Sequence, residues 1–187
     1  DFTLADGTAE IAALSTSTTI PLEIVSETKF EADETVIINL DASSVSGNTT
    51  ASGSNMSHTY QINNDDTKPT LNFSAVNISG GSASASSPSE EDGSAIITVS
   101  LSAISGVASS VTYTIASGSG ASDADWTDAT ADYDSDASTN IITWAADETT
   151  VDKTIVVNFT DDNIDEADEI ITVTLSGISG GAQNGST

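Results

Sequence analysis

The sequence predicts an all-β protein made of antiparallel, immunoglobulin-like β-sandwich repeats, with an incomplete sandwich at each chain end. Three observations support this prediction. Short segments rich in Val, Ile and Thr alternate apolar and polar residues, as half-buried strands do. Clusters of Gly, Ser, Asn and Asp separate these segments, which is typical of turns. Helical periodicity is almost absent, and one stretch of the strand pattern occurs twice.

Alternation assigns one inward face to each expected strand. The expected inward residues are Ile20, Leu22 and Ile24 in 20–24, Ile155, Val157 and Phe159 in 155–159, Val36, Ile38 and Leu40 in 35–40, and Ile171, Val173 and Leu175 in 170–175. The residues expected to face water are Asn39, Thr172 and Thr174. Further strands are expected at 57–62, 71–76, 94–101 and 111–116.

The segment 20–40 recurs as 155–175 at a constant offset of 135 residues and without a gap. Two strands and the turn between them therefore form an internal repeat. We expect the C-terminal part of a first repeat at 1–66 and a second repeat, lacking its last strand, at 67–187. Because the first residue is Asp, we expect a piece of a longer tandem array. The alternative is that copies of the chain complete each other by strand addition.

The charge excludes several classes of function. The chain has 29 acidic residues, three lysines, no arginine and a net charge of −26. Nucleic acid and anionic membrane surfaces are therefore poor partners, and no apolar run has the length of a membrane span. Cysteine is absent, which rules out disulfides and is compatible with a secreted bacterial protein.

The negative charge is concentrated in turns. The segment 160–169 holds six carboxylates, and the letters EADE occur both at 31–34 and at 166–169. Carboxylates about 4 Å apart repel each other by roughly 1–4 kcal/mol per pair. A Ca²⁺ ion, with about six to eight oxygen ligands, would reverse the sign of this energy. A solvated acidic loop is the alternative, but the same placement between the same two strands occurs twice, which favours calcium.

These segments resemble Calx-beta domains, which occur in sodium–calcium exchangers, integrin β4 and very large bacterial adhesins. The matching pattern is an Asp-aromatic pair, an apolar strand ending in acids, Glu-x-x-Glu, an alternating strand and a final strand closing on Asp-Asp. In the first copy it is DF, IPLEIVSE, EADE, TVIINL and HTYQINNDD; in the second it is DW, TIVVNFTDD, EADE and IITVTL. The resemblance implies a seven-stranded sandwich that binds Ca²⁺ where these loops meet.

The resemblance also implies calcium ligands, position by position. In the second copy they are Asp161, Asp162, Glu166, Glu169, Asp125 and Glu90 or Glu91. In the first copy they are Asp1, Glu27, Glu31, Glu34, Asp65 and Asp66, with Ser26 in place of the leading Asp of the turn. Asp132-Tyr133 is an alternative to Asp125-Trp126 as the Asp-aromatic pair of the second copy. The segment 132–139 also looks like the start of an EF-hand loop, but Ala137 replaces its Gly, so we expect a solvated insertion.

Other chemistry has little support in the sequence. The one histidine, His58, lies in an alternating strand, so no enzyme is expected. Trp126 and Trp144 are candidates for stacking on a sugar, although core packing is the expected role. We therefore expect a non-catalytic, calcium-binding extension module of a secreted or surface-anchored bacterial adhesin, stiffened by Ca²⁺ at its loop tips and inter-repeat junction. Its expected partners are neighbouring repeats or copies of itself, and a cell-surface or glycan target. The alternatives are a subunit of an extracellular filament assembled by strand complementation, and a carbohydrate-binding module.

Overall fold

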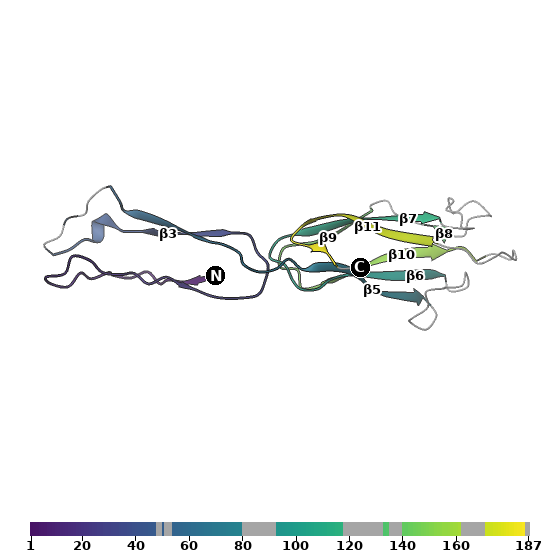
Figure 1. The fold of residues 1–187 in the computed structure, drawn as a ribbon, viewed down its shortest axis with the longest axis horizontal. Helices are drawn as coiled ribbons and strands as arrows, with labels where there is room; N and C mark the ends of the chain where they lie inside the picture. The colour runs from purple at the N-terminus through teal and green to yellow at the C-terminus, as the bar shows by residue number, and fades with distance from the viewer. Residues whose placement is uncertain are drawn as a thin grey trace.

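A computed structural model of the protein describes residues 1–47, 50, 54–79, 93–117, 133–134, 140–161 and 171–185. Over these residues it consists of β-strands and one 3-10 turn, η1 (Ala42–Ser44). The all-β class predicted from the alternation is confirmed. The strands form two lobes in a row along the long axis of the molecule (Figure 1), here called the first lobe (1–66) and the second lobe (67–185). No helix in the described part of the chain is long and apolar enough to cross a membrane.

The second lobe contains two sheets. The first sheet has the order β12-β5-β6-β10-β8, with bounds Gln183–Asn184, Thr70–Ser79, Ser94–Leu101, Asp152–Phe159 and Tyr133–Asp134. The second sheet has the order β11-β7-β9, with bounds Ile171–Gly180, Ser109–Ser117 and Ile141–Trp144. Neighbouring strands are antiparallel, except that β12 pairs with β5 in parallel. This is the β-sandwich that the strand pattern predicted.

The hydrophobic core lies between these two sheets. Val99 and Ile155 come from the five-stranded sheet, and Val111 and Trp144 come from the three-stranded sheet; all four are at most 2% exposed and belong to one cluster. Successive side chains of a strand point to opposite faces, so each strand contributes every second residue to this core. Burying an aliphatic side chain of this size contributes about 1.5–3 kcal/mol to folding.

The strands of the second lobe follow the sequence prediction closely. β6 covers the predicted segment 94–101, and β7 and β10 each contain the predicted segment and three further residues. Val157 of β10 is 2% exposed, and Val173 and Leu175 of β11 pack against the core. Thr172 and Thr174 are exposed, as expected for the opposite face.

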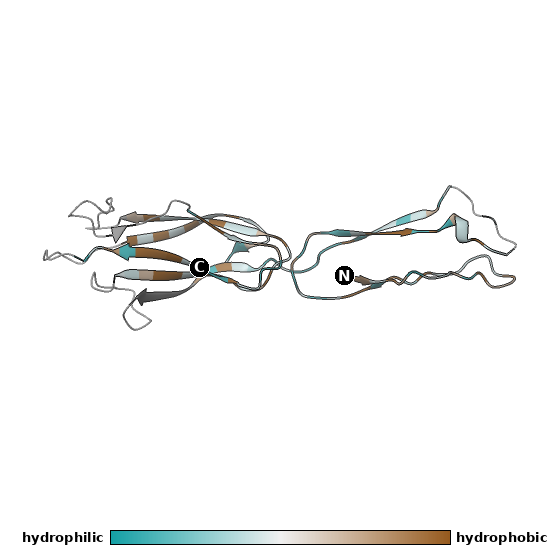
Figure 2. Cartoon of the chain, turned by 180° about the vertical axis from the view of Figure 1, so that it is seen from behind, coloured by the Kyte–Doolittle hydropathy of each residue, from teal (hydrophilic) through white to brown (hydrophobic). Residues whose placement is uncertain are grey.

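The first lobe contains two separate antiparallel pairs of strands. β1 (Phe2–Thr3) pairs with β2 (Glu23–Ile24), and β3 (Glu34–Asn39) pairs with β4 (Ser57–Ile62). The strand predicted over 20–24 is shorter than predicted, since only its last two residues pair. Apolar residues recur along the strands of both lobes (Figure 2), but in the first lobe no described strand occupies the places that β6 and β7 have beside β10 and β11. Of the residues predicted to face inward in this lobe, Val36 is buried, Leu22 and Ile38 are half-buried, and the prediction is wrong for three that are exposed: Ile20, Ile24 and Leu40.

Candidate metal centre

The acidic turn of the first copy lies at the end of the first lobe that faces the second lobe (Figure 1). The turn connects β2 to β3, and β4 returns beside β3 with Ile62 opposite Glu34. The loop that follows β4 therefore begins next to the turn. Antiparallel pairing thus brings the EADE turn at 31–34 and the loop at 63–66 to the same end of the lobe.

Three carboxylates meet at this end. Asp1, Glu31 and Glu34 each offer an oxygen, and these oxygens lie within 4.8 Å of one another. The short β1–β2 pairing holds Asp1 at this end, because the Asp1 carbonyl oxygen accepts a hydrogen bond of 2.9 Å from the Val25 N–H. The side chain of Glu31 is only 21% exposed, whereas Asp1 and Glu34 are exposed.

An open depression of about 360 Å³ surrounds the three clustered carboxylates. Its lining includes all six residues that the family resemblance indicated for the first copy, namely Asp1, Glu27, Glu31, Glu34, Asp65 and Asp66. The residues come from the start of the chain, from the turn after β2 and from the loop after β4. The fold therefore gathers three separate acidic segments at one place.

A polar framework that the sequence analysis missed holds the two loops together. The side-chain oxygen of Asn64 accepts a hydrogen bond of 2.9 Å from the Glu31 N–H, and its amide group donates one of 3.0 Å to the carbonyl oxygen of Asp66. In return, the carboxylate of Asp33 accepts from the Asn64 N–H at 2.9 Å and from the Gln61 side chain at 3.2 Å. Asp33 therefore ties the loops together, although it belongs to the same EADE motif as Glu31.

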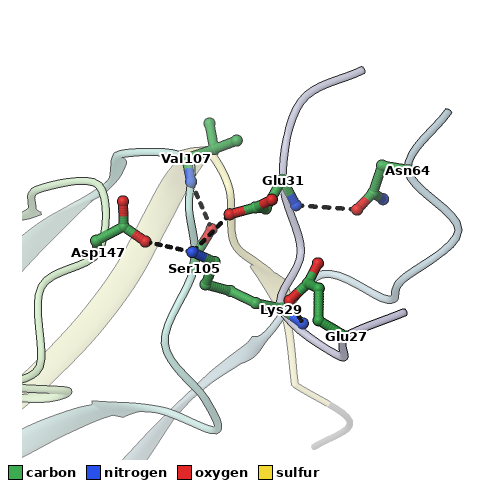
Figure 3. A network of polar contacts seen from close by, with 7 residues as sticks. All are labelled: Glu27, Lys29, Glu31, Asn64, Ser105, Val107 and Asp147. Carbon is green, nitrogen blue, oxygen red and sulfur yellow. Dashed lines mark hydrogen bonds and ion pairs between the residues drawn. The ribbon is translucent and has the colours of Figure 1, made fainter. Parts of the chain in front are cut away.

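A lysine lies beside the acidic turn, at the contact with the second lobe (Figure 3). The Lys29 ammonium is 2.5 Å from a carboxylate oxygen of Glu31 and 2.7 Å from one of Asp147, which belongs to the second lobe. Its backbone N–H donates to Glu27 at 2.7 Å. The hydrogen bonds to Asp147 and Glu31 raise the pKa of Lys29 above its ordinary value.

The donor set of the depression suits a hard divalent cation. Ca²⁺ binds carboxylate oxygens at about 2.3–2.6 Å, so two oxygens on opposite sides of one ion are about 5 Å apart. The spread of 4.8 Å within the cluster of Asp1, Glu31 and Glu34 fits this span. Glu27, Asp65 and Asp66 could supply further oxygens, and the bound ion would offset the repulsion between the carboxylates.

The two copies can be compared through the register of their sheets. β1 pairs Phe2 with Ile24 in the first lobe, and β8 pairs Tyr133 with Phe159 in the second. Ile24 and Phe159 hold the same place in the repeat, because they are separated by its offset of 135 residues. Tyr133 therefore corresponds to Phe2.

This correspondence favours Asp132-Tyr133 over Asp125-Trp126 as the Asp-aromatic pair of the second copy. Among the predicted ligands of that copy, Asp161 is described and is exposed just after β10. The others lie outside the described residues: Asp125, Glu90, Glu91, Asp162, Glu166 and Glu169. Most of the EF-hand-like segment 132–139 also lies outside them, apart from the two residues of β8.

The residues that the sequence offered for sugar binding or catalysis have structural roles where the structure describes them. Trp144 is 2% exposed, and its indole N–H donates to the Val151 carbonyl oxygen at 2.9 Å, so its ring is not available to stack on a sugar. Trp126 lies outside the described residues. His58 is an exposed strand residue whose ring lies 4.5 Å from that of Tyr60 in an edge-on contact.

Comparison with known families decides how the acidic cluster is interpreted. The family model of the Calx-beta domain matches residues 1–66 and 75–187. The chain belongs to the Calx-beta family. Calx-beta domains are non-catalytic, calcium-binding β-sandwich modules, so the cluster at the end of the first lobe lies in a family whose members bind this ion. No curated protein and no solved structure matches the chain.

Proposed function

We propose that this chain is a non-catalytic structural module that binds Ca²⁺ at its loop tips and is stiffened by the ion there and at the junction between the repeats. One observation carries the proposal. The six first-copy residues carried over from the Calx-beta pattern all line a single depression, although they come from three separate segments of the chain. An acidic surface that served only solubility would not require these segments to converge.

The stiffening follows from linkage between binding and folding. Without a cation, the gathered carboxylates repel one another and favour loops that move apart. Calcium binds the gathered loops and not the unfolded chain, so it stabilises the folded form by RT ln(1 + [L]/Kd), about 2.7 kcal/mol at a hundred times Kd. An ion held by Asp1, Glu31 and Asp66 would tie the start of the chain, the acidic turn and the loop before the second lobe.

The proposed setting is a secreted or surface-anchored bacterial adhesin, in which neighbouring repeats are the immediate partners and a cell-surface or glycan target is the remote one. The support for this setting is the acidic, cysteine-free composition and the internal repeat. Two lobes in a row along one axis (Figure 1) suit a module that extends a chain. No catalytic role is proposed for any residue.

Isothermal titration calorimetry with Ca²⁺ tests the proposal. Glu31→Gln/Glu34→Gln removes two of the three clustered charges and keeps the side-chain shapes, so we expect at least a tenfold loss of affinity at one site. Glu10→Gln is the matched control, because Glu10 is exposed and lies outside the depression. Wild-type protein that takes up no calcium, or a double variant that binds like wild type, would contradict the proposal.

A second candidate function is a filament subunit that assembles by strand complementation. The observation that favours it is the exposed apolar surface of the first lobe, where Ile24 is 54% exposed and Ile37 is 59% exposed. In addition, β11 is an edge strand of its sheet, and such edges pair readily with other strands. Multi-angle light scattering in calcium separates the two functions: a spacer elutes as a monomer, and a filament subunit gives a series of oligomers.

A further inference from the structure

The few basic residues of the chain are concentrated at the junction between the lobes. The chain has three basic residues against 29 acidic ones. Lys29 contacts Asp147 across the junction. The ammonium of Lys68 lies 5.3 Å from the centre of the Phe30 ring and donates to the Gly180 carbonyl oxygen at 2.9 Å. Two of the three lysines therefore join the first lobe to the second.

Glu31 belongs both to the acidic cluster and to this junction. It is one of the three clustered carboxylates, and it pairs with Lys29. Its side chain also lies against the backbone of the second lobe, since a Cβ atom at Gly106 would be 2.8 Å from its Cγ atom. The Gly106 N–H donates to the Phe30 carbonyl oxygen at 2.8 Å. A change in the position or charge of Glu31 therefore alters the contact between the lobes.

The partner of Lys29 in the second lobe is held in a fixed position. The Asp147 N–H donates to the carbonyl oxygen of Ser105 at 2.8 Å. Ser105 is 5% exposed, and its hydroxyl oxygen accepts from the Val107 N–H at 3.1 Å (Figure 3). The carboxylate of Asp147 thus projects from a hydrogen-bonded loop that faces the acidic turn.

We propose that Lys29 is a built-in counter-ion, which clamps the two lobes together without calcium and competes with calcium for Glu31. Only the competition with calcium rests on the proposed function; the clamp does not. A monovalent ammonium group between Glu31 and Asp147 neutralises part of the repulsion across the junction. The same positive charge opposes the entry of a divalent ion beside it. Lys29 therefore lowers calcium affinity at the cluster and keeps the lobes in register when calcium is scarce.

The test is Lys29→Met, which keeps an unbranched side chain that is one atom shorter and removes its charge. We expect calcium affinity by calorimetry to rise about three- to tenfold, while the junction becomes looser in EDTA. The junction is followed by electron–electron double resonance between labels on Ile37→Cys and Thr114→Cys, one in each lobe. Both positions are exposed, and the chain has no cysteine of its own. Without Lys29, the distance distribution in EDTA should broaden.

Two variants control this test. Lys153→Met removes a lysine that pairs with Glu148 inside the second lobe, and should change neither calcium affinity nor the distance distribution. Asp147→Asn cuts the bridge on the side of the second lobe only, so it should broaden the distribution in EDTA without raising calcium affinity. Far-ultraviolet circular dichroism checks that each variant is folded.

The two halves of the proposal fail separately. If Lys29→Met and Asp147→Asn both keep the wild-type distribution in EDTA, the clamp is refuted. If Lys29→Met binds calcium no more tightly than wild type, the competition is refuted. Wild-type protein that binds no calcium overturns the proposed function, and the measurement in EDTA still decides whether Lys29 holds the lobes together.

Discussion

The two lobes carry the same sequence repeat but are stabilised in different ways. In the second lobe, Ile155 is 2% exposed in a core between two sheets; its counterpart at the repeat offset, Ile20, is 41% exposed. Among residues 1–66 that the structure describes, the only buried apolar residue is Val36. The first lobe instead has the acidic depression, and the hydrogen bonds of Asn64 link the loops that line it.

This difference shows what an alternating strand can and cannot specify. Alternation predicts Ile20 and Ile155 on the same face of equivalent strands, but β2 begins only at Glu23, so Ile20 lies just before it. Burial depends on a second sheet that faces them, and only the second lobe has one among its described strands. Hydrophobic burial therefore stabilises the second lobe, whereas polar links and, in our proposal, calcium order the first.

The largest expected effect comes from the matched pair Ile155→Ala and Ile20→Ala. The first variant leaves a cavity in the core and should lower the free energy of unfolding of the second lobe by about 2–5 kcal/mol. The second changes an exposed side chain and should cost less than about 1 kcal/mol. Urea unfolding measures both. Equal losses at the two positions would show that the lobes do not differ as described.

Calcium should have the next largest effect, and it should be seen in the first lobe. At a hundred times Kd the ion stabilises the bound form by about 2.7 kcal/mol, so the slowest amides of β3 and β4 should exchange with deuterium about a hundredfold more slowly than in EDTA. In Glu31→Gln/Glu34→Gln this slowing should be lost. If the exchange rates of the wild type are the same with and without calcium, calcium does not order the first lobe.

The Asn64 framework predicts a smaller effect. Asn64→Leu removes two hydrogen bonds and leaves the Glu31 N–H without its acceptor, at a cost of about 1–2 kcal/mol. If Asn64 positions the calcium ligands, the variant also has a smaller rise in melting temperature when calcium is added. Asn39→Leu, at an exposed position of β3 outside the depression, is the control. An unchanged calcium response in Asn64→Leu would make Asn64 a purely structural residue.

The smallest effect concerns an ion pair of the second lobe and depends on pH. The hydrogen bond from Lys153, and then that from the Ala145 N–H, lower the pKa of Glu148. A lowered pKa gives stability that is present above the unfolded value, 4.5, and is lost as the pH falls through the folded value. Glu148→Gln should therefore be slightly less stable than wild type at pH 7, and in urea unfolding the difference should shrink as the pH falls below 4.5. Lys153→Met should show the same trend. A difference from wild type that does not shrink with falling pH would mean that another interaction causes it.

The sequence predicted the parts of the molecule that local patterns determine. Period-two alternation located β6 and β10, and the repeated EADE motif with the closing Asp65-Asp66 pointed to the acidic depression. It did not predict the contact of Lys29 with Asp147, because a separation of 118 residues along the chain leaves no local signal. It also missed Asn64, which lies in a polar stretch where nothing distinguishes it from Asn63 until the loops are folded.

The central claim is that the acidic segments of the first lobe gather to hold a calcium ion. An anomalous difference map from crystals grown in millimolar calcium tests it most directly. If calcium binds there, the map contains a strong peak within about 2.3–2.6 Å of carboxylate oxygens of Asp1, Glu31 and Glu34. Calcium-rich crystals in which these three carboxylates turn apart, with no peak between them, would contradict it.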